Sequence, residues 1–326
     1  MTEAFRPAWW LRNPHAQTIW GKFARGTPLP PVRRERWETP DGDFLDLARM
    51  EGEAGRPRLL LLHGLEGTPR SHYVRGFFVE ARRRGWAADL LLFRCCGDEP
   101  NRLLRSYHSG ETGDIDLVAR RLRAEDPGRP IVAAGVSLGG NVLLKWLGEQ
   151  GERAKEVVVR AAAISTPYDL AEGCRHLERG FSRVYGWHFL RTLRAKAREK
   201  HARFPGRVRW GDVARSRTLW EFDDAFTAPV HGFRDAADYY ARASSIGFLA
   251  GIRVPTLLLS AADDPFLPPA VLDRVRAVVG ANAVVTMQFS DRGGHVGFIG
   301  GMAPWRADYY AEARAIEFLA QGDAAR

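Results

Sequence analysis

The chain has 326 residues, of which 45% are hydrophobic and 27% charged, and its formal net charge is +9. These values are typical of a folded globular protein, and they exclude a disordered chain, a collagen and a coiled coil. No apolar run approaches the roughly 20 residues that span a bilayer, and the first residues lack the pattern of a secretory signal, so we expect a cytoplasmic protein.

Cysteine and histidine are sparse and scattered. The three cysteines are Cys95, Cys96 and Cys174, and an odd number of them argues against a disulfide framework. No Cys/His spacing resembles a zinc site. We therefore expect neither a metal ion nor another cofactor.

The positive charge is concentrated in one segment. Residues 175–217 contain 13 Lys or Arg against three acidic residues. A solvated helical surface is the simplest interpretation, and a patch facing an anionic substrate or membrane surface is the alternative. Because no recognised nucleic-acid-binding motif accompanies this charge, we expect no nucleic-acid partner. The oligomeric state stays open.

The predicted elements begin with two strands, 34–38 and 43–49. Their alternating apolar and polar residues predict a half-exposed antiparallel hairpin, with its turn at Asp41-Gly42. Continuous apolar runs then alternate with amphipathic segments. The runs predict buried strands at 58–62, 86–93, 130–136, 157–165, 256–261 and 283–289, and the amphipathic segments predict helices at 71–84, 112–124, 139–149 and 305–320.

This alternation predicts an α/β fold: a mostly parallel eight-stranded sheet, covered on both faces, with the antiparallel hairpin at its start. The alternation of strands and helices is interrupted over about 168–250, a polar, Arg-rich and aromatic stretch with helical patterns. Because that stretch is too long for an unstructured loop, we expect an inserted helical cap. With an N-terminal strap of about 1–30, these parts form one expected domain, 1–326.

One strand end carries a candidate nucleophile. Gly135-Val136-Ser137-Leu138-Gly139 lies between a predicted buried strand and a predicted helix. The glycines permit a sharp turn that exposes the serine above the carboxyl ends of the strands. A Gly-rich turn with an ordinary serine is the alternative. We predict that Ser137 is the nucleophile of a serine hydrolase, which requires a base and an acid that orients the base.

The candidate base and acid follow the last two predicted strands. His295 lies in Gly293-Gly294-His295-Val296-Gly297, and the adjacent Asp263 and Asp264 come after the preceding strand. Asp264 is the favoured acid because it leaves the turn in the usual register, and Asp263 is expected to brace the turn. The resulting order, Ser137, Asp264 and His295, is the one expected for α/β-hydrolases.

Two backbone N–H groups are the candidate oxyanion hole. One belongs to Leu138, directly after the nucleophile, and the other to Leu65, in the segment 62–67 after an early strand. Gly64 allows the backbone to approach closely. His63 precedes these residues, and we expect it to be structural rather than a second base.

Together these motifs resemble the YheT-like branch of the α/β-hydrolase superfamily, which includes abhydrolase-domain esterases and lipases. The resemblance covers nearly the whole chain. It implies the α/β-hydrolase fold and a serine hydrolase whose triad of Ser137, Asp264 and His295 cleaves carboxylic esters. The segments that carry it are 9–18, 63–67, 105–112, 136–141, 264–268 and 293–298.

One loop departs from the family pattern, which usually reads Phe-Arg-Gly-Cys-Ser-Gly-Glu-Pro-Asn. Here Cys95 and Asp98 replace the two glycines. Any left-handed backbone conformation at these positions would therefore be strained. We expect Cys95 and its neighbour Cys96 to be small, inert thiols.

The leading functional hypothesis is a carboxylesterase or lipase that acts through an acyl-serine intermediate on a small-molecule ester or lipid, such as an acylglycerol or a phospholipid. An acyltransferase would use the same residues. A non-catalytic binding protein on a hydrolase scaffold is a third hypothesis, disfavoured because all three triad residues are present. The acyl chain length and the alcohol of the substrate stay open.

Overall fold

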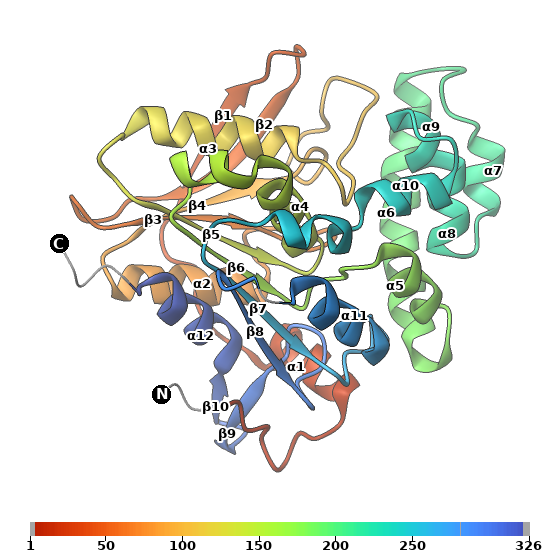
Figure 1. Ribbon diagram of the computed structural model, residues 1–326. Coiled ribbons are helices and arrows are strands. Elements are labelled where there is room, and N and C mark those ends of the chain that lie inside the picture. Colours follow the sequence, from red (N-terminus) through yellow and green to blue (C-terminus); the bar gives the residue numbers. More distant parts are fainter. Residues whose placement is uncertain (1–3, 281, 322–326) are drawn as a thin grey trace.

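An eight-stranded sheet forms the centre of the computed structural model, which describes residues 4–280 and 282–321 (Figure 1). Residues 1–3, 281 and 322–326, which the expected domain includes, lie outside the described residues. The strand order is β1-β2-β4-β3-β5-β6-β7-β8. Strands β3 to β8 run parallel and the strands at the start pair antiparallel, which confirms the predicted mixed α/β sheet. The strands are β1 (Arg33–Glu38), β2 (Phe44–Met50), β3 (Arg58–Leu62), β4 (Ala87–Leu92), β5 (Ile131–Val136), β6 (Arg160–Ile164), β7 (Thr256–Ala261) and β8 (Val285–Ser290).

The prediction of a half-exposed first hairpin is wrong for its second strand. Every residue of β2 is buried, because its two faces pack into hydrophobic cores on opposite sides of the sheet: Leu45 and Leu47 into one, Ala48 and Met50 into the other. Its polar side chains form ion pairs instead of facing water: Arg49 contacts Asp89 at 2.7 Å, and Asp46 contacts Arg36 at 2.8 Å. The alternation of apolar and polar residues therefore predicted the strand correctly and its exposure wrongly.

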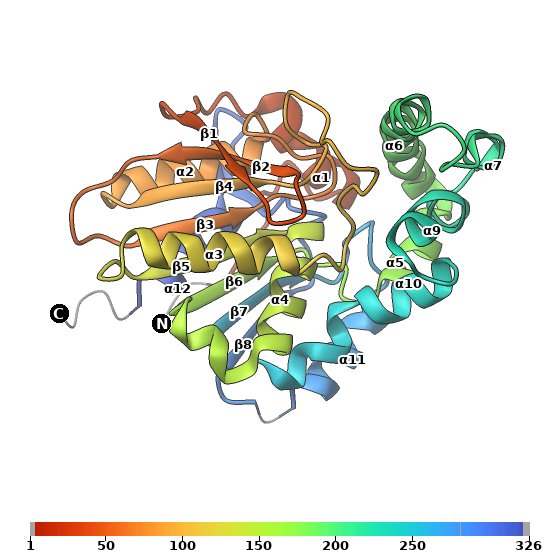
Figure 2. The same ribbon diagram turned by 90° about the horizontal axis from the view of Figure 1, so that it is seen from above.

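Helices cover both faces of the sheet (Figure 2). Apolar side chains of α2 and α12 share one core with the sheet, and those of α3, α4 and α11 share a second core on the opposite face. Both faces of the parallel strands are therefore buried, as their continuous apolar runs require. These helices are α2 (His72–Arg83), α3 (Gly113–Glu125), α4 (Leu138–Gln150), α11 (Pro269–Val279) and α12 (Tyr310–Leu319), and a 3₁₀ segment, η1 (Gly151–Glu156), follows α4.

A helical insertion lies between β6 and β7 and stands at one side of the sheet (Figure 1). It has a small core of its own, built around Leu190, Val213 and Phe222. No helix in the described part of the chain, α6 included, is both long and apolar enough to cross a bilayer. The insertion comprises α5 (Leu170–Leu177), η2 (Gly180–Ser182), α6 (Arg183–Arg203), α7 (Trp210–Arg215), α8 (Leu219–Phe222), the π-helical η3 (Asp223–Thr227), α9 (Ala228–His231), α10 (Ala236–Ala243) and η4 (Ser245–Gly251).

Helix α11 was not predicted, and neither were three further elements. Helix α1 (Pro14–Ala24) begins at Asn13, whose side chain accepts hydrogen bonds from the first backbone N–H groups of the helix. Strands β9 (Ile299–Ala303) and β10 (Arg306–Tyr309) form a separate antiparallel hairpin. The terminal helix predicted from about 305 therefore begins only at Tyr310, because the residues before it belong to β10.

Candidate active site

The turn after β5 places Ser137 in a conformation that its glycine neighbours allow. Ser137 has a φ of 55°, which is uncommon for a residue with a side chain. A Cβ atom on Gly135 would lie 2.4 Å from the carbonyl oxygen of Gly139, and one on Gly139 would lie 2.4 Å from that of Leu62. Larger residues at either glycine would therefore push the strand and the helix apart.

Three side chains from separate strand ends form one hydrogen-bonded chain. Ser137 Oγ lies 2.9 Å from His295 Nε2, and His295 Nδ1 lies 2.9 Å from Asp264 Oδ2. His295 and Asp264 are both buried. A proton on Nδ1 bonds to the carboxylate, which leaves Nε2 free to accept the serine proton. The structure thus brings together the three residues that the sequence singled out.

The adjacent aspartates have different partners. Asp264 contacts the imidazole, and its Oδ1 also accepts the backbone N–H of Phe266 at 2.8 Å. Asp263 Oδ1 accepts the backbone N–H of Gly294 at 2.9 Å, and burial raises the pKa of its carboxyl. Asp263 therefore fixes the loop that carries His295.

Several residues that hold His295 were missed by the sequence reasoning. Thr18 Oγ1, on α1, accepts the backbone N–H of His295 at 2.9 Å, and Ser165 Oγ accepts that of Val296 at 2.9 Å. A Cβ atom on Gly297 would lie 2.7 Å from the carbonyl oxygen of Gln17, so α1 packs directly on this loop. The sequence showed the motif at 9–18, but it did not show that this segment packs on the loop that carries His295.

An aromatic ring covers the imidazole. The rings of Phe266 and His295 stack with their centroids 3.8 Å apart and an interplanar angle of 8°. Because Phe266 follows Asp264 by two residues, one short turn supplies both the acid and this ring.

The candidate oxyanion donors lie on either side of Ser137. A Cβ atom on Gly64 would lie 3.2 Å from Ser137 Cβ, so a side chain at this position would crowd the serine. Within the described residues, the N–H groups of Leu65 and Leu138 donate to no protein acceptor. The N–H groups next to Leu65 are fixed: Gly64 N–H donates to Tyr73 OH at 2.9 Å, and Glu66 N–H donates to Tyr107 OH at 3.2 Å.

His63 and the cysteine pair do not contact this hydrogen-bonded chain. His63 is buried, accepts the backbone N–H of Phe93 through Nε2 at 3.1 Å, and has a pKa lowered by burial to about 4. Cys95 has a φ of 66°, so the loop keeps the left-handed conformation that favours glycine. Burial raises the pKa of the Cys96 thiol to about 12. In the described ranges, no group of three or more His, Cys, Asp or Glu is placed to hold a metal ion.

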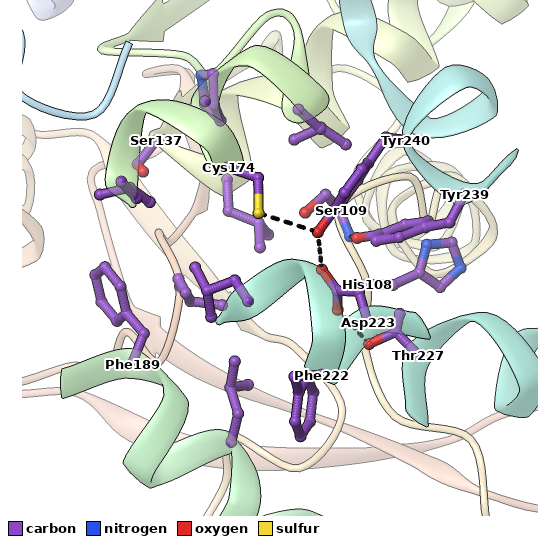
Figure 3. A pocket seen from close by; sticks show the side chains of 18 of the residues that line it. His108, Ser109, Ser137, Cys174, Phe189, Phe222, Asp223, Thr227, Tyr239 and Tyr240 are labelled. Carbon is purple, nitrogen blue, oxygen red and sulfur yellow. Dashed lines mark hydrogen bonds between the residues drawn. The ribbon is translucent and has the colours of Figure 1, made fainter. Parts of the chain in front are cut away.

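A cavity opens beside Ser137 and runs along the helical insertion (Figure 3). It encloses about 840 Å³ of empty space, its open mouth included. Leu65 and Leu138 line it next to Ser137, so the candidate nucleophile and both candidate oxyanion donors face the same space. Most of the remaining wall is apolar and comes from the insertion: Leu170, Leu177, Phe189, Leu193, Leu219 and Phe222.

Comparison with known proteins assigns the family. A family model described as the alpha/beta hydrolase fold matches residues 57–301. The chain belongs to the α/β-hydrolase family. Within this family it lies in the YheT-like branch, since it is 41% identical over 304 residues to the Escherichia coli protein named "Putative esterase YheT", which covers 91% of this chain and 87% of that protein. The resemblance stated from the motifs is thereby confirmed.

Other α/β-hydrolases extend this comparison. "Phospholipase ABHD3" of Mus musculus is 29% identical over 318 residues, 95% of this chain and 76% of that protein. "Monoacylglycerol lipase" of Saccharomyces cerevisiae is 29% identical over 292 residues, 86% of this chain and 62% of that protein. Among solved structures, an esterase of Pyrococcus furiosus, Pf2001, has a TM-score of 0.57 at 14% identity and covers 89% of this chain and 92% of that one, which shows a shared fold. The chain is therefore an α/β-hydrolase of an esterase- and lipase-type branch.

Proposed function

We propose that this α/β-hydrolase is a serine carboxylic-ester hydrolase that uses Ser137 as nucleophile, His295 as general base and acid, and Asp264 as the orienting carboxylate. The observation that carries the proposal is the continuous chain of 2.9 Å contacts from Ser137 through His295 to Asp264. A serine is a weak nucleophile without such a base.

The reaction begins when Ser137 Oγ attacks the ester carbonyl carbon while His295 Nε2 takes the hydroxyl proton. The carbonyl oxygen becomes an oxyanion, which the N–H groups of Leu65 and Leu138 stabilise. Collapse of this intermediate breaks the bond to the alcohol, and His295 returns the proton to the leaving oxygen. Water, deprotonated by His295, then attacks the acyl-serine, and the acid leaves with Ser137 restored.

The substrate is an ester with an apolar part that fits the cavity. Its wall of leucine and phenylalanine side chains favours an acyl or alkyl chain. The relatives named as a phospholipase and a monoacylglycerol lipase support lipid esters as the class. We assign to the helical insertion the role of a cap that shields the acyl-serine from bulk water and shapes this wall.

Replacing the nucleophile tests the proposal. Ser137→Ala is expected to lower the hydrolysis of p-nitrophenyl esters by at least about a thousandfold, with an unchanged circular dichroism spectrum, because the remaining groups cannot form the acyl intermediate. Ser109→Ala is the matched control, since Ser109 lines the same cavity but does not contact His295. Hydrolysis that survives in Ser137→Ala would overturn the proposal.

A further inference from the structure

The cavity beside Ser137 has a polar end, formed by residues of the insertion. Asp223, Thr227, Tyr240 and Cys174 all line it, and Figure 3 shows the hydrogen bonds between them. The Tyr240 hydroxyl donates to Asp223 Oδ2 at 2.6 Å, and the Thr227 hydroxyl donates to Asp223 Oδ1 at 2.5 Å. The Tyr240 oxygen also lies 3.4 Å from Cys174 Sγ. A carboxyl group is thus held in a fixed orientation inside a largely apolar cavity.

Asp223 has acceptor capacity left. An ionised carboxylate has about four lone-pair positions, and the two hydroxyls occupy only two of them. Among the described residues, no lysine, arginine or histidine forms an ion pair with Asp223. A hydrogen-bond donor that enters the cavity would therefore meet an acceptor with free capacity and no competing cation.

The charge on Asp223 is costly to keep. Burial raises the pKa of its carboxyl to about 6, although the bonds from Thr227 and Tyr240 oppose this shift. A charge held in this largely apolar cavity without a cation opposes folding. Asparagine could link the same two hydroxyls without charge, because hydroxyl groups accept as well as donate. A purely structural link therefore does not require an aspartate here.

The backbone that carries Asp223 is also irregular. Helix α8 continues into the π-helical η3, which begins at Asp223 and ends at Thr227. Single π-helical turns are rare in proteins overall, and those that occur are often found at functional sites. The bond between Asp223 and Thr227 spans this turn, so the irregular segment itself fixes the carboxyl.

We propose that Asp223, together with Tyr240, is a specificity-determining site that binds a hydrogen-bond donor on the part of the ester that enters the cavity. The donor is a hydroxyl group or a protonated amine, separated from the ester carbonyl by the length of the apolar wall. This inference rests on the proposed ester hydrolysis at Ser137. The preferred substrates are thus hydroxylated or amino-substituted esters rather than esters with purely alkyl chains.

Matched substrate series test the proposal. On the acyl side, p-nitrophenyl alkanoates from hexanoate to decanoate are compared with their ω-hydroxy and ω-amino counterparts. On the alcohol side, alkyl acetates are compared with the monoacetates of the matching diols and amino alcohols. We expect the wild type to favour a donor-bearing ester by about tenfold or more in kcat/KM in one series, because hydrogen bonds to charged groups are strong. The hydroxy and amino arms identify the donor.

Variants connect this preference to the carboxyl group. Asp223→Leu is expected to remove the preference, and Asp223→Asn, which can keep both links to the hydroxyls, is expected to reduce it severalfold while hydrolysis of the alkyl esters persists. Asp224→Asn is the control, since Asp224 is exposed and does not line the cavity. A second readout needs no turnover: the Ser137→Ala variant should bind octane-1,8-diol or 8-aminooctanol more tightly than octan-1-ol in calorimetry.

The outcomes separate this inference from the proposed function. A wild type that hydrolyses alkyl esters but shows no preference in either series overturns the role of Asp223 and leaves Ser137 in place. A preference that survives in Asp223→Leu also overturns it. If the wild type hydrolyses no ester and Ser137 is unreactive, the proposed function itself fails.

Discussion

At the scale of single residues, two neighbouring aspartates are distinguished only by their partners. Asp264 contacts His295 Nδ1, whereas Asp263 accepts a backbone N–H from the loop that carries His295. We expect Asp264→Asn to lower kcat by about 10⁴, because the amide loses the charge that stabilises the imidazolium and can favour the wrong tautomer. Asp263→Asn keeps an oxygen acceptor for Gly294 and should cost less than about tenfold. Ester hydrolysis by both purified variants measures this, and the reverse order would contradict the assignment of the acid.

Cys95 stands where the family pattern has glycine, so its stability cost shows what a side chain costs at this position. Its φ of 66° is a left-handed conformation that costs a residue with a side chain about 1–2 kcal/mol. We expect Cys95→Gly to raise the free energy of unfolding by about 0.5–1 kcal/mol, since glycine removes this strain but loses more chain entropy on folding. Asp98→Gly is the control, because Asp98 also replaces a family glycine but has no positive φ. Denaturant unfolding should show a gain for Cys95→Gly alone; equal effects in both variants would argue against strain at Cys95.

The sequence was sufficient for residues whose position follows from a strand end. Ser137, Asp264 and His295 come after β5, β7 and β8, and parallel strands bring their carboxyl ends to one edge. Thr18, on α1, could not be found in this way, and Ser165, although it directly follows β6, carried no sign of its partner. Each accepts a backbone N–H from a residue more than a hundred positions away, and a hydroxyl in that role leaves no periodic signal in the sequence.

At the scale of elements, the insertion is tied to the loop that carries the candidate oxyanion donor. Lys196 of α6 donates to Glu66 Oε1 at 2.7 Å, and Tyr107 OH donates to the same oxygen at 2.7 Å. Glu66 follows Leu65 directly and has a φ of 58°. We therefore propose that Lys196 is a positioning residue, which holds the loop through Glu66 and does not line the cavity beside Ser137.

Removing this link should affect turnover more than binding. We expect Lys196→Met to lower kcat about tenfold with KM changed less than about threefold, because a displaced Leu65 N–H stabilises the oxyanion less well. Lys196→Arg should restore most of kcat, since the guanidinium can still donate to Glu66. Arg198→Met, an exposed change on the same helix, is the control. If Lys196→Met lowers the unfolding temperature and leaves kcat within twofold of the wild type, the role is structural only.

The features that the sequence reasoning missed depend on neighbours rather than on local pattern. Strand β2 was predicted, but its burial was not, because that burial comes from the two cores that cover its faces and from the ion pairs that satisfy its charges. The short hairpin of β9 and β10 contains glycine and a register shift, which weaken any alternation. Elements with a clear pattern, such as the continuous apolar run of β3 and the amphipathic α3, were placed to within about two residues of their observed bounds.

At the scale of the whole molecule, exposed aromatic and basic side chains adjoin on the insertion and the strap. Phe181 and Trp187 are 56% and 63% exposed, and His15 of α1 packs on Phe181 with ring centroids 4.7 Å apart. Arg183, Arg191 and Arg198 are exposed on α6, whereas Lys196 is engaged by Glu66. We therefore propose that the insertion contacts anionic lipid surfaces, which is the alternative interpretation of the charge in residues 175–217.

Vesicle co-sedimentation tests that contact. We expect binding to vesicles that contain phosphatidylserine at low salt and weaker binding at high salt, because the screening length falls to about 3 Å at 1 M. Reversing Arg183, Arg191 and Arg198 to glutamate should weaken binding by more than about tenfold. Reversing the exposed Arg56, Arg82 and Arg153 is the matched control. If both triple variants bind equally, or if the wild type does not bind at low salt, the basic patch is only a solvated surface.

The central claim is that Ser137 is the nucleophile, and a covalent adduct measures it most directly. The purified protein is treated with a fluorophosphonate, digested, and mapped by mass spectrometry. The chain of contacts from Ser137 to Asp264 predicts one adduct, on Ser137, whose formation slows by orders of magnitude in His295→Ala, because the hydroxyl then has no base. An adduct on another residue, or a Ser137 that stays unmodified in the folded wild type, would contradict the account.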